Sequence, residues 1–308
     1  MAILTGIQSK LRGSAGSITF RRNGGQTIMS EKITEVRVSR TEAQARQRTK
    51  WANIIAMYKG LRPLLNYGFE SRPRNLSDYN MFVKVNMQQT PVYLTKQAVA
   101  GGACIAAPYQ LTQGSLPAIV VSGDGQSAVT DISLGVETIN ADTTVAQFSR
   151  AVVGNNADYG YGDQISYFMV KQLVNAATEI PYCQFSASKV VLDAADDRKL
   201  WDVVISNGFK SQDGKLAHGG NDGDCVYAWV HSRKSNGRTL VSSQTFIDAN
   251  TKLSDYVGDL AYNLAASSYG LTNPVYLTPN GGSGTDATPS SGGGGGDNPG
   301  GGGGNDSL

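Results

Sequence analysis

The chain has 308 residues, 40% of them hydrophobic, and a formal net charge of +2, so it is long enough for two or three small domains with their own cores and is not a disulfide miniprotein. Its three cysteines, Cys104, Cys183 and Cys225, are odd in number and share no metal-ligand spacing, which argues against a disulfide framework and a zinc site. Because no apolar run reaches the length of a signal-peptide core or a membrane span, we expect a soluble protein made in a reducing cytoplasm.

The first predicted element is a β-hairpin within residues 11–33. Two strand-like runs flank Asn23, Gly24 and Gly25, and Asn and Gly tolerate the positive φ that a tight hairpin turn requires. The basic pair Arg21 and Arg22 directly precedes this turn. We interpret the hairpin as a candidate docking element.

Two helices follow the hairpin. Residues 41–62 form the clearest helical pattern, with Ser39 or Thr41 as the cap and Pro63 as the stop. Its apolar stripe recurs at helical spacing and comprises Trp51, Ile54, Ile55, Tyr58 and Leu61. The second helix begins at Ser77, and its apolar side comprises Tyr79, Phe82, Val83 and Met87.

From Pro91 onward the sequence pattern changes to short β-branched and aromatic segments separated by Gly, Asn, Asp and Ser, which predicts mainly antiparallel β domains. Residues 162–170 (GDQISYFMV) and 223–231 (GDCVYAWVH) share a pattern, with Phe168 and Trp229 in equivalent places. This similarity suggests two β units of about sixty residues each. A late helix is predicted at 254–266, with an apolar face of Tyr256, Val257, Leu260, Ala261 and Leu264.

The predicted fold is therefore α+β. An N-terminal hairpin and two helices precede mainly antiparallel β domains, either sandwich or barrel-like, and a Gly-rich tail that we expect to be disordered. The predicted divisions are a basic region at 1–90, a first β-rich domain at 91–190, a second at 191–278 with a C-terminal helix, and the tail at 279–308.

The charge is distributed unevenly along the chain. Residues 1–90 contain 15 Lys/Arg and 5 Asp/Glu, a balance of +10, whereas residues 91–308 contain 12 and 20, a balance of −8. The basic part predicts an acidic partner, either nucleic acid or the surface of another protein. It also permits head-to-tail contact between copies of this chain. The alternative is an ordinary solvated basic face.

Residues that carry chemistry are sparse. The chain has only two histidines, His218 and His231, and it contains no phosphate-binding glycine motif. The loop containing Asp222 and Asp224 has carboxylates that a hard cation prefers, but it lacks the spacing of a calcium loop. We therefore predict a protein that is not an enzyme, with no catalytic residues, no cofactor and no metal site.

The motifs LRGSAGSITFRRNGGQTIMSEKI, RTEAQARQRTKWANIIAMYKGLRPLL, FESRPRNLSDYNMFVKVNM and PVYLTK resemble the N-terminal part of a family of uncharacterised proteins from gut Bacteroidales and the crAss-like phages that infect them. The resemblance covers about the first 120 residues. It implies a phage context and a virion component, such as part of a tail or a portal-proximal ring. It transfers no enzymatic residues.

These observations together predict a non-enzymatic virion structural protein that is made in the host cytoplasm and assembles, as a homo-oligomer and with other virion proteins, through its basic N-terminal region. The predicted partner-binding residues are Arg12, Arg21, Arg22, Asn23, Gly24, Gly25, Arg46, Arg48 and Lys50. One alternative is a nucleic-acid-binding module that contacts phosphates through the same residues. Another is a carbohydrate- or cation-binding β module on a surface fibre. No membrane partner is expected.

Overall fold

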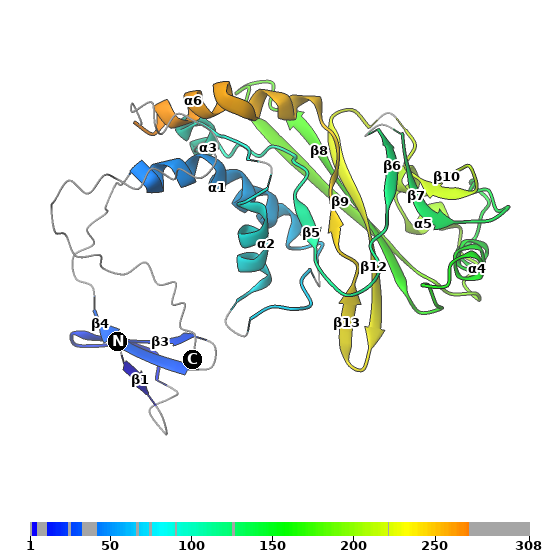
Figure 1. The fold of residues 1–308 in the computed structure, drawn as a ribbon, viewed down its shortest axis with the longest axis horizontal. Helices are drawn as coiled ribbons and strands as arrows, with labels where there is room; N and C mark the ends of the chain where they lie inside the picture. Colours follow the sequence, from blue (N-terminus) through cyan, green and yellow to red (C-terminus); the bar gives the residue numbers. More distant parts are fainter. Residues whose placement is uncertain are drawn as a thin grey trace.

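The computed structural model describes residues 2–4, 11–23, 26–32, 42–65, 68–73, 76–89, 91–124, 127–220 and 222–270 (Figure 1). The α+β prediction is confirmed: helices accompany sheets whose named strands all pair antiparallel, and no sheet within these ranges closes into a barrel. The predicted tail at 279–308 lies outside the described residues. None of the helices in these ranges is both long enough and apolar enough to cross a membrane.

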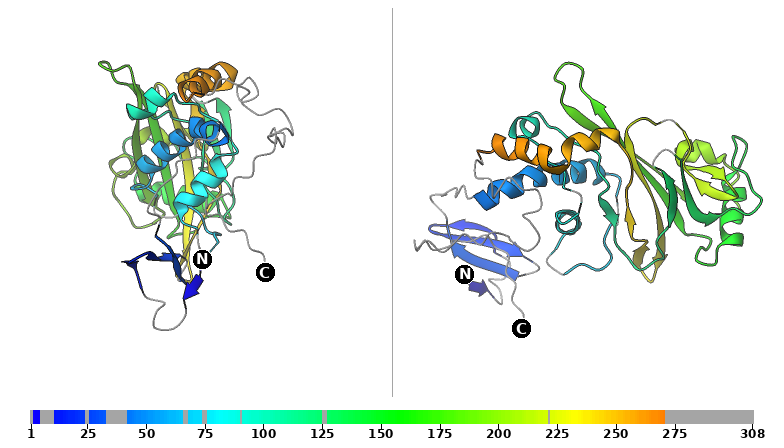
Figure 2. Two further views of the ribbon diagram at one scale, coloured as in Figure 1. Left: turned by 90° about the vertical axis from the view of Figure 1, so that its left-hand side faces the viewer. Right: turned by 45° about the horizontal axis from the view of Figure 1, so that its top comes forward.

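The N-terminal part forms a four-stranded sheet from β1 (Ala2–Leu4), β2 (Gly13–Ala15), β3 (Ile18–Asn23) and β4 (Gln26–Glu31), in the order β1-β4-β3-β2. The predicted hairpin is confirmed, because β3 pairs with β4 up to the Asn23–Gln26 pair, although Gly24 and Gly25 lie outside the described residues. This N-terminal sheet lies apart from the helices and the other sheets in Figure 1 and in the right-hand view of Figure 2.

Both predicted N-terminal helices are present as α1 (Glu42–Leu61) and α2 (Asp78–Asn86). The Ser77 side chain caps α2 by accepting a hydrogen bond from the Asn80 N–H, whereas the predicted caps of α1, Ser39 and Thr41, are not among the described residues. The apolar stripe of α1 needs one correction. Trp51 is 42% exposed, and Met57 takes its place in the core because the buried face of α1 is centred on Ile54, Met57 and Leu61.

A central sheet connects the two predicted β-rich domains. It contains β9 (Pro181–Val191), β8 (Gln164–Val174), β12 (Cys225–Ser235) and β13 (Arg238–Val241) in that order, with β15 (Ile247–Ala249) also paired to β12. The repeated pattern at 162–170 and 223–231 is thus a pair of neighbouring strands, β8 and β12, rather than two separate units. The predicted division at residue 190 runs through this single sheet.

A second sheet in the order β10-β11-β7-β6 also crosses that division. Its strands are β6 (Val121–Asp124), β7 (Ser127–Ser133), β10 (Lys210–Gln212) and β11 (Lys215–Ala217). The helix α4 (Val145–Asn155) contacts β7, and α5 (Leu200–Val203) contacts β9 of the central sheet. A separate pair of short strands is formed by β5 (Gln110–Thr112) and β14 (Gln244–Thr245). The remaining short elements are α3 (Lys96–Ala100) and the 3₁₀ helices η2 (Ser206–Gly208) and η3 (Thr251–Tyr256).

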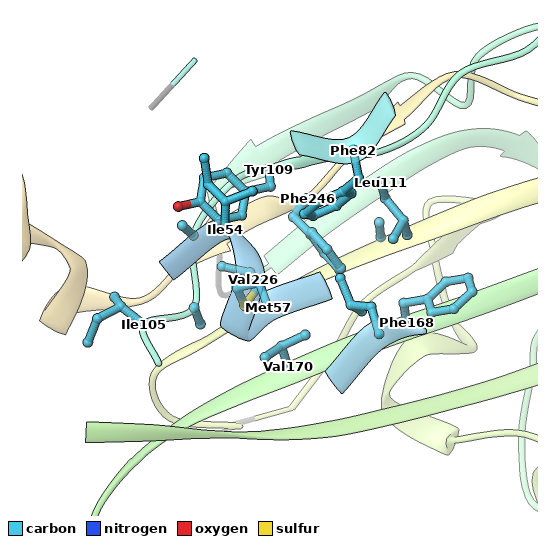
Figure 3. Close-up of a cluster of buried hydrophobic side chains, with 14 of the residues drawn as sticks. Ile54, Met57, Phe82, Ile105, Tyr109, Leu111, Phe168, Val170, Val226 and Phe246 are labelled. Atoms are coloured by element: carbon cyan, nitrogen blue, oxygen red, sulfur yellow. The ribbon is translucent and has the colours of Figure 1, made fainter. Parts of the chain in front are cut away.

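Strands β8 and β12 are buried on both faces, because successive side chains of a strand point to opposite sides. Phe168 and Val170 face a core shared with α1 and α2 (Figure 3). Tyr167 and Trp229 face a second core, which contains side chains of the second sheet and of α4. The molecule is therefore layered, with helices on one side of the central sheet and the second sheet on the other (Figure 1). Burial on both faces explains why these strands read as continuous apolar runs.

Buried polar side chains hold the extended segment 103–107 in place within the first core. Asn53 of α1 donates to the Ile105 carbonyl at 2.9 Å and accepts from the Ile105 N–H at 2.7 Å. Gln172 of β8 accepts from the Ala106 N–H, and Asn250 donates to the Ala106 carbonyl. These bonds satisfy backbone groups that would otherwise be buried without partners.

The last described helix, α6 (Gly258–Ser268), packs through a different face from the predicted one. Of the predicted face, Ala261 is buried and Tyr256 and Val257 are half-buried, but Leu260 and Leu264 are 75% and 60% exposed. Tyr262, Ala265 and Ala266 supply the rest of the buried face. The Tyr262 ring meets Tyr93 edge-on at 5.0 Å between centroids. The predicted pattern began in the preceding 3₁₀ helix, which has a different periodicity, so the expected face does not continue into α6.

Candidate functional site

The structure divides the predicted partner-binding residues between two elements. Arg12, Arg21 and Arg22 are exposed on the N-terminal sheet, whereas Arg48 is exposed on α1. Lys50 of α1 is half-buried and engaged in an interaction. The described side chains do not include those of Asn23 and Arg46, and Gly24 and Gly25 fall outside the described residues. The two groups are joined by residues 33–41, which are likewise outside the description.

Arg21 and Arg22 lie on opposite faces of the N-terminal sheet, because they are consecutive residues of β3. Arg22 pairs with Thr27, and Phe20 pairs with Met29, so these four residues lie on one face together with Ile18. Arg21 pairs with Ile28 on the other face. The basic pair therefore does not form one continuous surface.

We call Ile18, Phe20 and Met29 the apolar face of the sheet. Ile18 is 37% exposed, and Phe20 and Met29 are only half-buried. Among the side chains described for residues 11–32, none of the apolar ones is buried. Small sheets of this kind need a covered apolar face for stability in water. Thr27, which lies on the same face beside Arg22, is fully buried, so the apolar face is only partly covered, and Ile18 is its exposed end.

A second polar cluster lies where β8 begins and β12 ends. Asp163 Oδ2 accepts a hydrogen bond from His231 Nε2 at 3.0 Å, and both side chains are almost fully buried. The guanidinium of Arg233 donates to both oxygens of Asp163, at 2.8 and 2.6 Å. Because the two strands are antiparallel neighbours, the residue before β8 meets the residues near the end of β12.

The electrostatics of this cluster fix its protonation. Burial acts to raise the pKa of Asp163, but hydrogen bonds from Arg233, the Gly160 N–H and His231 outweigh it, so its pKa lies below the ordinary value. Burial lowers the pKa of His231, and the bond to Asp163 offsets only part of this effect. His231 is therefore neutral at pH 7 and carries its proton on Nε2, facing the carboxylate. Its Nδ1 is a buried acceptor without a donor in the structure.

A pocket of about 190 Å³ lies beside this cluster, which is room for about six water molecules. Its lining residues come from four segments and comprise Pro117, Ala118, Asp131, Ile132, Asn156, Ala157, Asp158, Tyr159 and His231. The Tyr159 ring stacks on His231 with 4.3 Å between ring centroids. Burial, with the nearby carboxylates Asp131, Asp158 and Asp163, raises the pKa of Tyr159 well above its ordinary value. The pocket therefore presents acceptors and an aromatic ring.

The two carboxylates of the pocket can bind a hydrogen-bond donor. Asp131 and Asp158 are exposed at its wall, and within the described chain neither carboxylate has a hydrogen-bond or ion-pair partner. Among the described residues, no three or more His, Cys, Asp and Glu side chains lie together as the ligands of a metal ion would.

The loop that suggested a cation site has another role. Asp222 is almost fully buried and is held by Lys171 at 2.9 Å and by the Asn207 amide. Asp224 accepts from the Thr251 hydroxyl. His218 is also buried, bonded to the Tyr167 hydroxyl at 2.9 Å, so neither histidine is solvated. The Asp222 carboxylate is thus already occupied by protein donors.

Sequence reasoning missed the Asp163, His231 and pocket arrangement. The Gly-Asp that precedes each repeated strand was a usable signal, because antiparallel pairing of those strands brings Asp163 to His231. No family model, curated protein or solved structure matches this chain.

Proposed function

We propose that this protein is a non-enzymatic structural subunit of a phage particle, and that it assembles with further copies of itself through the N-terminal sheet. A tail or portal-proximal ring is the proposed location. The observation that carries the assembly part of the proposal is the partly exposed apolar face of Ile18, Phe20 and Met29, on a small sheet set apart from the helices and the other sheets (Figure 1).

Simple energetics support assembly as the source of stability for this sheet. Full burial of an apolar side chain of this size stabilises by about 1.5–3 kcal/mol. A unit of roughly 30 residues buries too little surface to be stable alone and usually needs a metal, disulfides or oligomerisation. The described residues 11–32 contain no cysteine and no metal-binding cluster. Contact with another chain adds apolar burial of the kind that such a sheet needs.

A second copy of this chain fits as the partner because the charges are complementary. Arg12, Arg21, Arg22 and Lys32 are exposed on the N-terminal sheet, against a single acidic residue, Glu31. Residues 91–308 carry the balance of −8. Such complementarity favours contact between unlike ends of two copies and disfavours contact between like ends.

Light scattering after size exclusion tests the proposal. The full chain is expected to form a defined oligomer, and Phe20→Glu is expected to dissociate it by placing a charge on the apolar face. Ser17→Glu is the matched control, because Ser17 is exposed in the turn between β2 and β3 and the same charge there is expected to leave assembly intact. Equal oligomers from the parent and Phe20→Glu would contradict the proposal.

Mass spectrometry of purified phage particles tests the location separately. The proposal expects this chain at a fixed ratio to other particle proteins. Absence from particles would contradict the virion role. If the purified chain instead binds nucleic acid, with an affinity that falls steeply as the salt concentration rises, the nucleic-acid alternative is favoured.

A further inference from the structure

We infer that the pocket beside His231 receives the guanidinium of Arg22 from a second copy of the chain. This inference rests on the proposed assembly and assigns the two surfaces that meet. It concerns the pocket lined by Asp131, Asp158, Tyr159 and His231 on one copy, and the Arg22 end of the apolar face on the other.

The chemistry of the pocket selects a cation with several N–H donors. Asp131 and Asp158 offer carboxylate oxygens that no other described group uses. His231 lines the pocket with a ring that is only 1% exposed, so the exposed acceptors are the two carboxylates. A guanidinium has five N–H donors in a planar arrangement and no acceptor, so it matches a set of acceptors better than an ammonium does.

The negative charge of the pocket is not neutralised from within. Arg233 donates to the carbonyl of the lining residue Asp158, but its guanidinium is also bound to both oxygens of Asp163. Asp163 is therefore paired, His231 is neutral, and Asp131 and Asp158 together leave a charge of −2. Arg22 brings a positive charge, and no ion pair engages it within the described chain.

The surroundings of the pocket match the remainder of the apolar face. Pro117 and Ala118 are exposed at its wall, and Val120, whose carbonyl accepts from the Asp131 N–H, is 64% exposed. Tyr161 follows the lining residue Tyr159 by two positions and is 55% exposed. An apolar rim around a charged pocket is the arrangement that shields an ion pair from water.

The face of the sheet distinguishes Arg22 from its neighbour. Arg22 lies on the same face as Ile18 and Phe20, so an apolar contact by those side chains brings Arg22 to the same partner surface. Arg21 points away from that contact. The two surfaces differ and belong to different parts of the chain, so repeated contact is head-to-tail and closes into a ring or continues as a filament.

The test compares adjacent arginines in the full chain. Arg22→Gln is expected to raise the dissociation constant of the oligomer at least tenfold, which corresponds to about 1.4 kcal/mol. Arg21→Gln, with the same loss of charge one residue away, is expected to change it less than twofold. Asp131→Asn combined with Asp158→Asn is expected to match Arg22→Gln, and because these carboxylates are exposed and unpaired, the variant is expected to fold as the parent does.

A double-mutant cycle completes the test. If Arg22 meets the pocket, combining Arg22→Gln with the two Asp→Asn changes costs little more than either alone. Equal effects of Arg22→Gln and Arg21→Gln, or full additivity in the cycle, would overturn the inference. If Phe20→Glu loses assembly but Arg22→Gln assembles as the parent does, the pocket contact is contradicted and the proposed assembly stands. A monomeric parent chain would contradict both the pocket contact and the proposed assembly.

Discussion

Asp163 and His231 are 68 residues apart in the sequence, yet Asp163 Oδ2 accepts a hydrogen bond from His231 Nε2 at 3.0 Å. Asp163 immediately precedes β8, and His231 lies in β12. Their contact fixes the His231 ring against Tyr159 at the pocket wall. The same carboxylate accepts hydrogen bonds from Arg233, so Asp163 positions His231 at the pocket and links the start of β8 to β12.

Replacement of Asp163 is expected to destabilise the fold. Asp163→Asn removes the charged acceptor of the hydrogen bonds from Arg233 and His231, and because Arg233 is 37% exposed and stays solvated, the loss is expected to cost about 2 kcal/mol. Urea unfolding measures this change. Asp142→Asn serves as the control, because Asp142 pairs with Lys199 at a fully exposed site and its loss is expected to leave the midpoint close to that of the parent. Equal midpoints for Asp163→Asn and the parent would contradict the assigned role.

Stability is expected to fall as the pH drops below about 6.5, the pKa of an unperturbed histidine. Burial lowers the pKa of both His218 and His231, so the unfolded chain binds protons that the folded chain does not. Their contribution is fully present above the unfolded pKa and is lost as pH falls toward the lower folded values. Urea midpoints between pH 8 and pH 5.5 measure the effect. His218→Gln is expected to flatten the profile, and an unchanged slope would contradict this explanation.

A methyl group at Gly208 is expected to disrupt the second core. A Cβ there would lie 2.4 Å from Tyr167 Cγ, and the carbonyl of Gly208 accepts from the Trp229 indole at 2.7 Å. Gly208→Ala is expected to cost about 2 kcal/mol through overpacking. Gly154→Ala is the matched control. Gly154 lies in α4 with open space around it, so alanine there is expected to stabilise by up to about 1 kcal/mol. Thermal unfolding of the two variants distinguishes these outcomes.

The body is expected to fold without the N-terminal sheet. Every residue of the two large cores lies between Ile54 and Val257, and none comes from β1–β4. A chain that begins at Glu42 should therefore keep the circular dichroism spectrum of the helices and the unfolding midpoint of the parent body. Loss of the helical signal or of a cooperative unfolding transition in the shorter chain would show that the N-terminal sheet contributes to the cores.

The elements that could be predicted from the sequence are those governed by local patterns. The β3–β4 hairpin follows from Asn23 and the turn glycines, and α2 follows from its Ser77 cap. The pairing of β8 with β12 could not be predicted in this way, since a continuous apolar run does not specify its neighbour. For the same reason the division at residue 190 was placed inside a sheet.

The candidate site was predictable only in part. The basic residues Arg21 and Arg22 were recognised from charge, but their opposite orientation follows from the strand assignment of both residues. The pocket was not recognised, because Asp131, Asp158 and His231 carry no local motif and meet only through long-range packing. Trp51 and Leu260 were predicted to be buried from their helical spacing, but both are exposed, because no neighbouring described element packs over them.

Light scattering of the full chain beside the chain that begins at Glu42 tests the central claim most directly, because it removes the N-terminal sheet and leaves both cores. If the N-terminal sheet mediates assembly, the full-length chain forms an oligomer whose mass is a multiple of one chain, and the shorter chain is a folded monomer. The same oligomeric state for both, whether monomer or oligomer, would contradict assembly through the N-terminal sheet.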